Sequence, residues 1–289
     1  MKVIISIPAY NEEKTLGEVI KEIKEIMGSY DYSILVVNDG SEDNTAKIAR
    51  EIGAIVFSHD RRKGLAETFK FEMKKCLELR ADIIVHTDAD GQYKAADILK
   101  LLKKIEEGYD LVLGSRFEHG VYEGSFMKRW GNIAFAKVFS NILGIKITDT
   151  TTGFRAFTRE VAKLPLINNF TYTQEQLIRA GKNNMRIAEI PIKTNKTRES
   201  RLFKNSFTYA FRAWINIFRI YRDFDPMKFF GRIGLFFFSI GSLIGFYLVY
   251  SFLKYDVVGH IPLTILAVLL ILIGVQVILF GFLADMRRF

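Results

Sequence analysis

The sequence is poor in the residues that build covalent or zinc-bound frameworks. It has one cysteine, Cys76, so no disulfide can form within the chain, and its four histidines make no His/Cys cluster with the spacing of a zinc site. It also contains no motif of a nucleic-acid-binding module. These absences exclude a disulfide-stapled scaffold and a zinc domain, and they fit a reducing compartment.

The N-terminus lacks the long apolar run of a signal peptide. Pro8 interrupts its apolar stretch, and the polar residues 11–13 follow at once. A signal peptide has an apolar region of about 7–15 residues before a cleavage site with small residues. We therefore expect residues 2–7 to form a buried strand.

Long apolar runs are confined to the C-terminal third. The whole chain is 49% hydrophobic and 25% charged, with a mean hydropathy of +0.11. Residues 233–253 and residues 261–284 contain no charged side chain. At about 1.5 Å per residue, each run is long enough to cross a hydrocarbon core of about 30 Å. The sequence therefore predicts two membrane-spanning helices.

The charges that flank these runs predict their orientation. Lys228 and Arg232 precede the first run, Arg287 and Arg288 follow the second, and the connecting residues 254–260 hold one Lys and one Asp. Positive residues near membrane spans favour the cytoplasmic side. We expect a hairpin with both ends, and the preceding region, in the cytoplasm.

Residues 203–228 have the pattern of a helix that lies in a membrane interface. Aromatic side chains recur there at helical spacing with Lys and Arg beside them, and residues 201–232 carry a surplus of five positive charges out of the total of +9. This placement favours an anionic membrane surface over nucleic acid as the partner. Residues 126–143 form a second apolar and basic stretch, which fits either an interface helix or a helix packed on a sheet.

Strand and helix patterns alternate as far as about residue 115. Short runs rich in Val and Ile lie at residues 2–7, 32–37, 54–57, 82–87 and 110–114, with helical patterns at 16–27, 65–79 and 95–105. This alternation predicts an α/β fold with a mostly parallel sheet, whose ligands gather at the carboxyl ends of the strands.

Asp88 and Asp90 directly follow the run at 82–87. Residues two apart in an extended segment share a face, so we expect both carboxylates at the carboxyl edge of the sheet. Two carboxylates together with substrate phosphate oxygens suit Mg²⁺ or Mn²⁺. An Asp-x-Asp motif alone fits a helix cap as well, so it needs support from other residues.

Further motifs end the other strands. Residues 8–12 read Pro-Ala-Tyr-Asn-Glu, residues 38–41 read Asn-Asp-Gly-Ser, and residues 88–92 read Asp-Ala-Asp-Gly-Gln. This order and spacing resemble family 2 glycosyltransferases with the GT-A fold. The motifs at 114–117 and 149–157 are similar to those of the subgroup that makes polyprenyl-phosphate sugars, such as dolichyl-phosphate mannose and glucose synthases.

The resemblance covers roughly residues 1–200, and it implies roles for individual side chains. It places the nucleotide of a UDP- or GDP-linked sugar against Pro8, Tyr10, Glu12, Asp39, Asp88 and Gln92. It assigns Mg²⁺ or Mn²⁺ to Asp88, Asp90 and Gln92. It assigns the phosphate of a polyprenyl lipid to Arg116, Arg129, Arg198 and Arg201. The residues expected to carry catalysis are Asp90, Arg116 and Arg201.

Departures from the family pattern bear on the acceptor. Members that glycosylate hydroxyl groups carry a late Glu-Asp pair whose Asp is the base, whereas residues 173–176 here read Thr-Gln-Glu-Gln. A phosphate monoester is largely dianionic at neutral pH and needs no base. The Gln-x-x-Arg-Trp motif of processive synthases is also missing, so polymer synthesis is disfavoured. Asn38 stands where the commoner motif has Asp, which leaves base recognition open.

The combined expectation is a membrane enzyme in three parts. They are a GT-A domain at 1–202, a juxtamembrane helix at 203–228 and a transmembrane hairpin at 229–289. The expected reaction moves one hexose, with inversion, to polyprenyl phosphate at the cytoplasmic face. One alternative is an enzyme of the same fold that glycosylates a hydroxyl of a glycolipid or lipid-linked saccharide, with Glu175 as base; the other is a non-catalytic membrane scaffold that binds nucleotide. Gly241 and Gly245 allow close helix packing within the hairpin or in a homo-oligomer.

Overall fold

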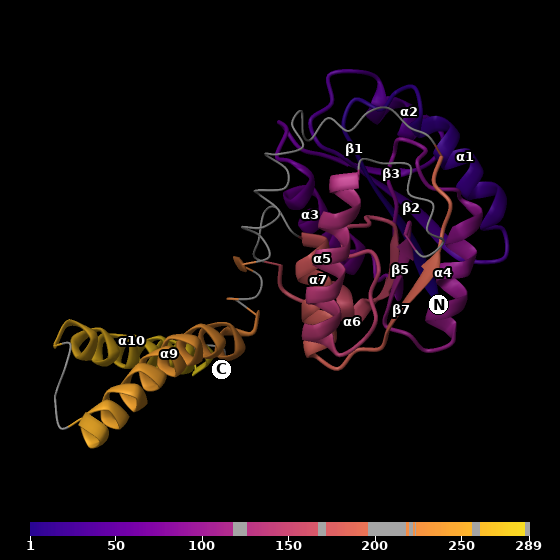
Figure 1. Ribbon diagram of the computed structural model, residues 1–289. Coiled ribbons are helices and arrows are strands. Elements are labelled where there is room, and N and C mark those ends of the chain that lie inside the picture. Colours follow the sequence, from indigo (N-terminus) through magenta and orange to yellow (C-terminus); the bar gives the residue numbers. More distant parts are fainter. Residues whose placement is uncertain are drawn as a thin grey trace. The chain divides into compact units, whose positions relative to one another are not determined.

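The computed structural model describes two compact units of the chain, Met1–Ser206 and Phe207–Phe289 (Figure 1). The residues described are 1–117, 126–166, 172–195, 218–219, 222, 224–255 and 261–286. The expected juxtamembrane helix at 203–228 lies mostly outside them, and the expected acceptor residues Arg198 and Arg201 lie outside them as well.

A seven-stranded sheet forms the centre of the first unit. Its strands are β1 (Lys2–Ala9), β2 (Asp31–Asn38), β3 (Ile55–Ser58), β4 (Ile83–His86), β5 (Leu111–Ser115), β6 (Arg155–Thr158) and β7 (Ile187–Pro191). They are ordered β3-β2-β1-β4-β6-β5-β7. Neighbours pair in parallel except that β6 runs antiparallel to both β4 and β5. The prediction of a mostly parallel α/β sheet is therefore confirmed.

Helices cover both faces of the sheet (Figure 1). They are α1 (Leu16–Ile26), α2 (Thr45–Glu51), α3 (Leu65–Glu78), α4 (Ala96–Glu106), α5 (Phe126–Leu143), α6 (Arg159–Ala162) and α7 (Tyr172–Lys182). The helices α1 and α4 bury their apolar residues with Val3, Ile5 and Ile7 of β1 in one core. On the other face, α3 buries Phe69 and other apolar side chains against β1 and β2.

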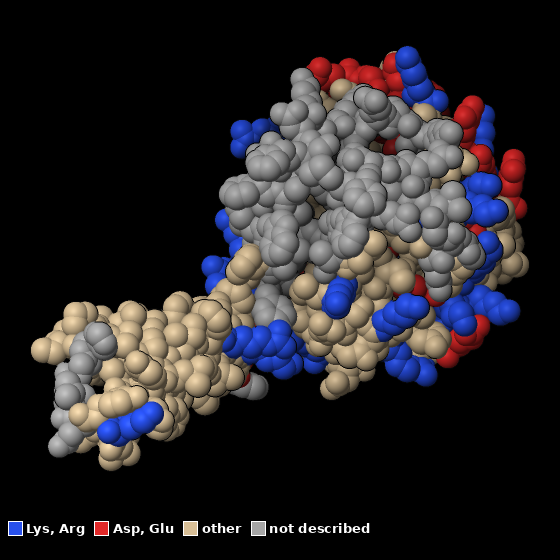
Figure 2. Space-filling model, viewed as in Figure 1, with Lys and Arg blue, Asp and Glu red and all other residues tan. Residues whose placement is uncertain are grey.

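The two long helices of the second unit are α9 (Pro226–Tyr255) and α10 (Ile261–Met286), with mean hydropathies of 1.9 and 3.0 over their most apolar windows. Their length and composition suffice to cross a membrane, as the sequence predicts. On the face that Figure 2 shows, most of this unit is uncharged and its Lys and Arg side chains lie towards its ends, whereas the sheet unit displays many Lys, Arg, Asp and Glu side chains.

Small residues bring α9 and α10 together. A Cβ added at Gly234 would lie 2.6 Å from the carbonyl oxygen of Gly274, and one added at Gly241 would lie 2.9 Å from that of Ala267. Beyond the local helix backbone, no heavy atom of the described residues lies within 4 Å of a Cβ built at Gly245. Gly241 therefore serves packing within the hairpin, one of the two arrangements that the sequence allows.

Candidate active site

Three loops meet where β1, β2 and β4 end. These strands are parallel neighbours, so the segments that follow Ala9, Asn38 and His86 lie at one edge of the sheet. The amide of Asn11 donates to Ser41 Oγ over 3.0 Å. The hydroxyl of Thr15 donates to the carbonyl of Ala89 over 2.9 Å. The expected gathering of the three motifs is confirmed.

Asp39 organises the loop that follows β3. It is 5% exposed, and its two carboxylate oxygens accept hydrogen bonds from the amides of Lys63, at 2.7 Å, and Gly64, at 2.9 Å. The next residue, Gly40, has a φ of +72°, and a Cβ there would lie 2.6 Å from the amide nitrogen of Arg62. Only glycine allows this close approach of the two loops.

The same loop carries a residue that sequence reasoning missed. The Arg62 guanidinium lies 4.3 Å from the centre of the Tyr10 ring, in a cation–π contact. The exposed basic run Arg61-Arg62-Lys63 was the available signal. Tyr10, expected at the nucleotide, therefore has a cationic neighbour.

Pro8 lies near the end of β1, and Glu12 lies in the loop that follows this strand. Pro8 is buried within β1. Glu12 is 8% exposed; its amide donates to Thr45 Oγ1 over 2.9 Å, and its carboxylate accepts from Thr15 over 3.2 Å. The contacts of Glu12 shape the loop between β1 and α1.

Asp88 and Asp90 lie close enough for their charges to interact. Asp88 follows β4 and is partly exposed, and Asp90 lies in the turn beyond it, where its Oδ1 accepts from the amide of Gln92 over 3.0 Å. The pKa of Asp88 is raised to about 6, mainly by burial; the charge of Asp90 also acts to raise it, while His86 and Arg116 act to lower it. An acidic pair with this repulsion attracts a cation.

The donor set fits a hard divalent ion shared with a substrate. The part of the chain that the structure describes holds no group of three or more His, Cys, Asp or Glu side chains suited to a metal. Mg²⁺ commonly takes one or two carboxylates and completes its shell with phosphate oxygens and water. A Cβ at Gly153 would lie 3.3 Å from Asp88 Oδ1, so the glycine leaves room for that carboxylate.

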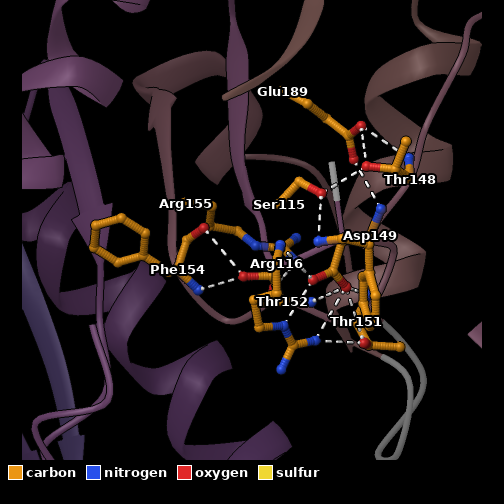
Figure 3. Close-up of polar contacts among 10 residues, drawn as sticks. Ser115, Arg116, Thr148, Asp149, Thr151, Thr152, Phe154, Arg155 and Glu189 are labelled. Atoms are coloured by element: carbon orange, nitrogen blue, oxygen red, sulfur yellow. Dashed lines mark hydrogen bonds and ion pairs between the residues drawn. The ribbon is translucent and has the colours of Figure 1, made fainter. Parts of the chain in front are cut away.

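Asp149 binds Arg116 (Figure 3), and the charge of Arg116 acts on the carboxyl of Asp88. The Nε of Arg116 lies 2.7 Å from Asp149 Oδ2, and its Nη2 donates to Asp149 Oδ1 over 3.0 Å and to Thr151 Oγ1 over 2.8 Å. Asp149 is 1% exposed. Burial acts to raise the pKa of Asp149, but the Arg116 charge and the hydrogen bonds from Arg116 and Thr151 lower it overall. The guanidinium is thereby oriented at the site.

Glu189 and Arg155 support the turn that carries Asp149, and sequence reasoning assigned a role to neither. Glu189 of β7 accepts from the amides of Thr148, at 2.8 Å, and Asp149, at 2.9 Å. Arg155 of β6 is fully buried and donates to the carbonyl oxygens of Thr152 and of Thr173 on α7. Burial lowers the pKa of Arg155 to about 10, so it stays charged at neutral pH. The turn is therefore held by β7, through Glu189, and by β6, through Arg155.

The other residues with expected roles are the alternative base and three acceptor arginines. Glu175 of α7 is 1% exposed, and its Oε1 forms an ion pair of 2.7 Å with Arg179. Arg129 lies in α5, but its side chain is outside the described part of the structure, as are Arg198 and Arg201.

Comparisons with known proteins agree with this architecture. The family model for glycosyl transferase family 2 matches residues 4–164. A UDP-N-acetylglucosamine–dolichyl-phosphate N-acetylglucosaminyltransferase of Methanococcus voltae is 30% identical over 239 residues, which are 74% of this chain and 94% of that protein. A dolichyl-phosphate hexose transferase of Haloferax volcanii is 35% identical over 184 residues, which are 63% and 78% of the two chains.

Solved structures share the fold at lower identity. Glucosyl-3-phosphoglycerate synthase of Mycobacterium tuberculosis, in complex with Mn²⁺, UDP and glucosyl-3-phosphoglycerate, superposes with a TM-score of 0.60 and 21% identity. The match covers 75% of this chain and 79% of that one. The same synthase has been solved with Mg²⁺ and UDP. The expected GT-A-like architecture is confirmed.

Proposed function

The chain belongs to glycosyl transferase family 2, and we propose that it transfers one hexose from a nucleoside-diphosphate sugar to the phosphate of a polyprenyl lipid at the cytoplasmic face of a membrane. Because relatives named as dolichyl-phosphate sugar transferases also match, the alternative of a non-catalytic scaffold is set aside.

The observation that carries the proposal is the position of Arg116. Asp149 holds its guanidinium in a bidentate ion pair, and the charge of Arg116 acts on the carboxyl of Asp88. An oriented cation beside the acidic pair suits an anionic acceptor that must approach the donor diphosphate. Two helices of membrane-spanning length in the same chain favour a lipid as the carrier of that anion.

The state of Glu175 supports a phosphate over a hydroxyl acceptor. A hydroxyl must lose its proton to attack, and the alternative makes Glu175 the base. Glu175 is buried and paired with Arg179, which suits a structural carboxylate. A phosphate oxygen is already ionised, so the reaction that we propose does not need Glu175 as a base.

The proposed reaction is a single in-line displacement. An oxygen of the lipid phosphate attacks the anomeric carbon, the bond from that carbon to the nucleoside diphosphate breaks, and the configuration inverts. Asp88 and Asp90 would hold Mg²⁺ or Mn²⁺, which supplies charge neutralisation for the departing diphosphate. Arg116 holds the acceptor phosphate, and Tyr10 and Arg62 lie at the nucleotide. Oriented binding of the two substrates contributes much of the rate.

The proposal is tested by product analysis. Purified protein in detergent should transfer label from one of a panel of UDP- and GDP-sugars to polyprenyl phosphate, with an acid-labile product of inverted anomeric configuration. The free polyprenol is the matched control, and it should receive no sugar. An acid-stable glycoside, formed on a hydroxyl and lost in Glu175→Gln, would establish the alternative acceptor.

A further inference from the structure

Behind the acidic pair, a histidine and a glutamate are buried together. His86 of β4 and Glu72 of α3 are both 0% exposed. His86 Nε2 lies 3.3 Å from Glu72 Oε2, and His86 Nδ1 lies 2.8 Å from the carbonyl oxygen of Gly153. The imidazole thus connects helix α3 to the segment that precedes β6.

The contacts determine where one proton lies. A carbonyl oxygen only accepts hydrogen bonds, so His86 Nδ1 must carry a proton and donate it to Gly153. On the other side, His86 Nε2 and Glu72 Oε2 face each other at 3.3 Å. Within the described residues, neither Glu72 oxygen nor His86 Nε2 has a hydrogen-bond partner.

Such a pair is costly as mere packing. Removing two ionisable groups from water is unfavourable, and apolar residues of similar volume are often as stable or more stable in a core. The centroids of the Phe69 and His86 rings lie 4.9 Å apart, so an aromatic side chain packs against the imidazole. The cost of burying His86 and Glu72 therefore indicates that the pair has a role other than packing.

Gly153 shows what the pair supports. A Cβ built on Gly153 would lie 3.3 Å from Asp88 Oδ1 and 3.7 Å from His86 Cε1, so its backbone sits between the two side chains. The same segment begins with Asp149, which binds Arg116. The hydrogen bond from His86 thus holds the strip of backbone that touches both the acidic pair and the arginine network.

We propose that His86 and Glu72 are positioning residues that tether Gly153 and so set the placement of Asp88 relative to Arg116. This inference rests on the proposed function, because the geometry that the tether sets is that of the metal–diphosphate site and its acceptor cation. Changing a residue that hydrogen-bonds or positions a metal ligand commonly alters metal affinity or activity by about 10–100-fold.

Two substitutions of one residue separate the tether from simple bulk. The amide nitrogen of Asn can take the place of Nδ1, whereas that of Gln takes the place of Nε2. We expect His86→Gln to weaken Mn²⁺ binding to the UDP or GDP complex by at least about ten-fold, and His86→Asn to weaken it by less than about three-fold. Mn²⁺ affinity is measured by electron paramagnetic resonance, without turnover. The kcat for transfer should fall with the same ranking while KM for the lipid changes little.

Met73→Ala is the control for lost stability. Met73 lies on α3 beside Glu72 and is a buried apolar residue, 4% exposed. This variant should unfold more easily yet bind Mn²⁺ as the wild type does. If His86→Gln lowers Mn²⁺ affinity no more than Met73→Ala does, or if Asn and Gln at 86 act alike, the tether is wrong. Should His86→Gln fail to fold, Glu72→Gln takes its place with the same expectation.

A spectroscopic measurement tests the tether without metal. In ¹⁵N-histidine-labelled protein, His86 Nδ1 should carry a proton across neutral pH, and the signal of this state should vanish in His86→Asn. An unprotonated Nδ1 would overturn the inference whatever the activity. A wild-type protein with the protonated Nδ1 but no metal-dependent nucleotide binding would instead contradict the proposed function.

Discussion

Asp88 lowers the stability of the fold when it is ionised, and the same ionised carboxylate can bind a cation. Its pKa is raised to about 6, above the ordinary value of 3.8, first by burial and then by Asp90. A carboxyl whose pKa is raised on folding contributes stability below its unfolded pKa, and that contribution is lost as the pH rises through the folded pKa. At neutral pH the ionised Asp88 therefore opposes folding until a cation binds.

Asp88→Asn should accordingly make the metal-free protein more stable while it abolishes transfer. At pH 7 we expect a gain of up to about 3 kcal/mol in the free energy of unfolding, from the two-unit shift in pKa. The gain should shrink as the pH falls below about 6. Urea unfolding in detergent with EDTA measures it. The exposed Asp31, at the opposite edge of the sheet, provides Asp31→Asn as the control, which should show no such gain.

The pH should also govern binding through the same carboxyl. Since the cation needs the ionised form, the affinity for Mn²⁺ with nucleotide should fall about ten-fold per pH unit below about 6 and stay level above it. Titration of Mn²⁺ binding between pH 4.5 and pH 8 tests this, with the folded state monitored by circular dichroism. A level affinity down to pH 4.5 would contradict a role for Asp88 as a ligand.

Arg116 and Asp149 should behave as one unit. Arg116→Ala leaves Asp149 buried without its counter-charge, so we expect a loss of about 3 kcal/mol of stability. Asp149→Asn in the same chain should restore at least about 1 kcal/mol of it, because the uncompensated charge is gone. The kcat/KM for polyprenyl phosphate, by contrast, should stay at least about ten-fold low in both variants, since the cation is still missing. Additive stability losses would show that the pair is not coupled.

At the scale of elements, the sequence was informative where patterns are local. The strands at the N-terminal side appear within a few residues of their predicted bounds because runs of Val and Ile buried on both faces are distinctive. The edge that collects residues 8–12, 38–41 and 88–92 follows from parallel pairing alone.

The parts that sequence reasoning missed depend on contacts between distant residues. The strand β6 has four residues and contains the fully buried Arg155, so its composition does not suggest a strand. Its antiparallel pairing with β4 places Gly153, just before β6, beside Asp88. The contacts of Glu189 with Thr148 and Asp149 span about forty residues, and no spacing in the sequence indicates them.

Gly40 gives an element-scale prediction. In Gly40→Ala the new Cβ would meet the backbone of Arg61 and Arg62 at 2.6–2.7 Å, so the loop bound by Asp39 must move. We expect the affinity for the nucleoside diphosphate to fall by at least about ten-fold, which matches a strain of about 1–3 kcal/mol. Gly53 also has a positive φ, of +83°, but only the flexible end of Lys24 lies near it. Gly53→Ala should therefore lose some stability and no affinity.

For the whole molecule, the distribution of charge relates the catalytic unit to a membrane. Lys228 and Arg232 lie near the start of α9, and Arg287 and Arg288 follow α10 in the sequence. The predicted hairpin puts these two basic ends on the same side of the membrane. In the proposed reaction the donor is a nucleotide sugar and the acceptor phosphate is carried by a lipid, so both must be reached from one side of the bilayer.

Cysteine labelling tests that orientation. The native Cys76 is buried, and burial raises the pKa of its thiol, so it contributes little background. Tyr255 and Met286 are 61% and 72% exposed at the last residues of α9 and α10. We expect Tyr255→Cys to react with an impermeant maleimide added outside intact cells, and Met286→Cys to react only after the membrane is opened. The reverse result would place Lys228, Arg232 and the preceding unit outside the cytoplasm, away from the compartment in which the proposal places the sugar donor.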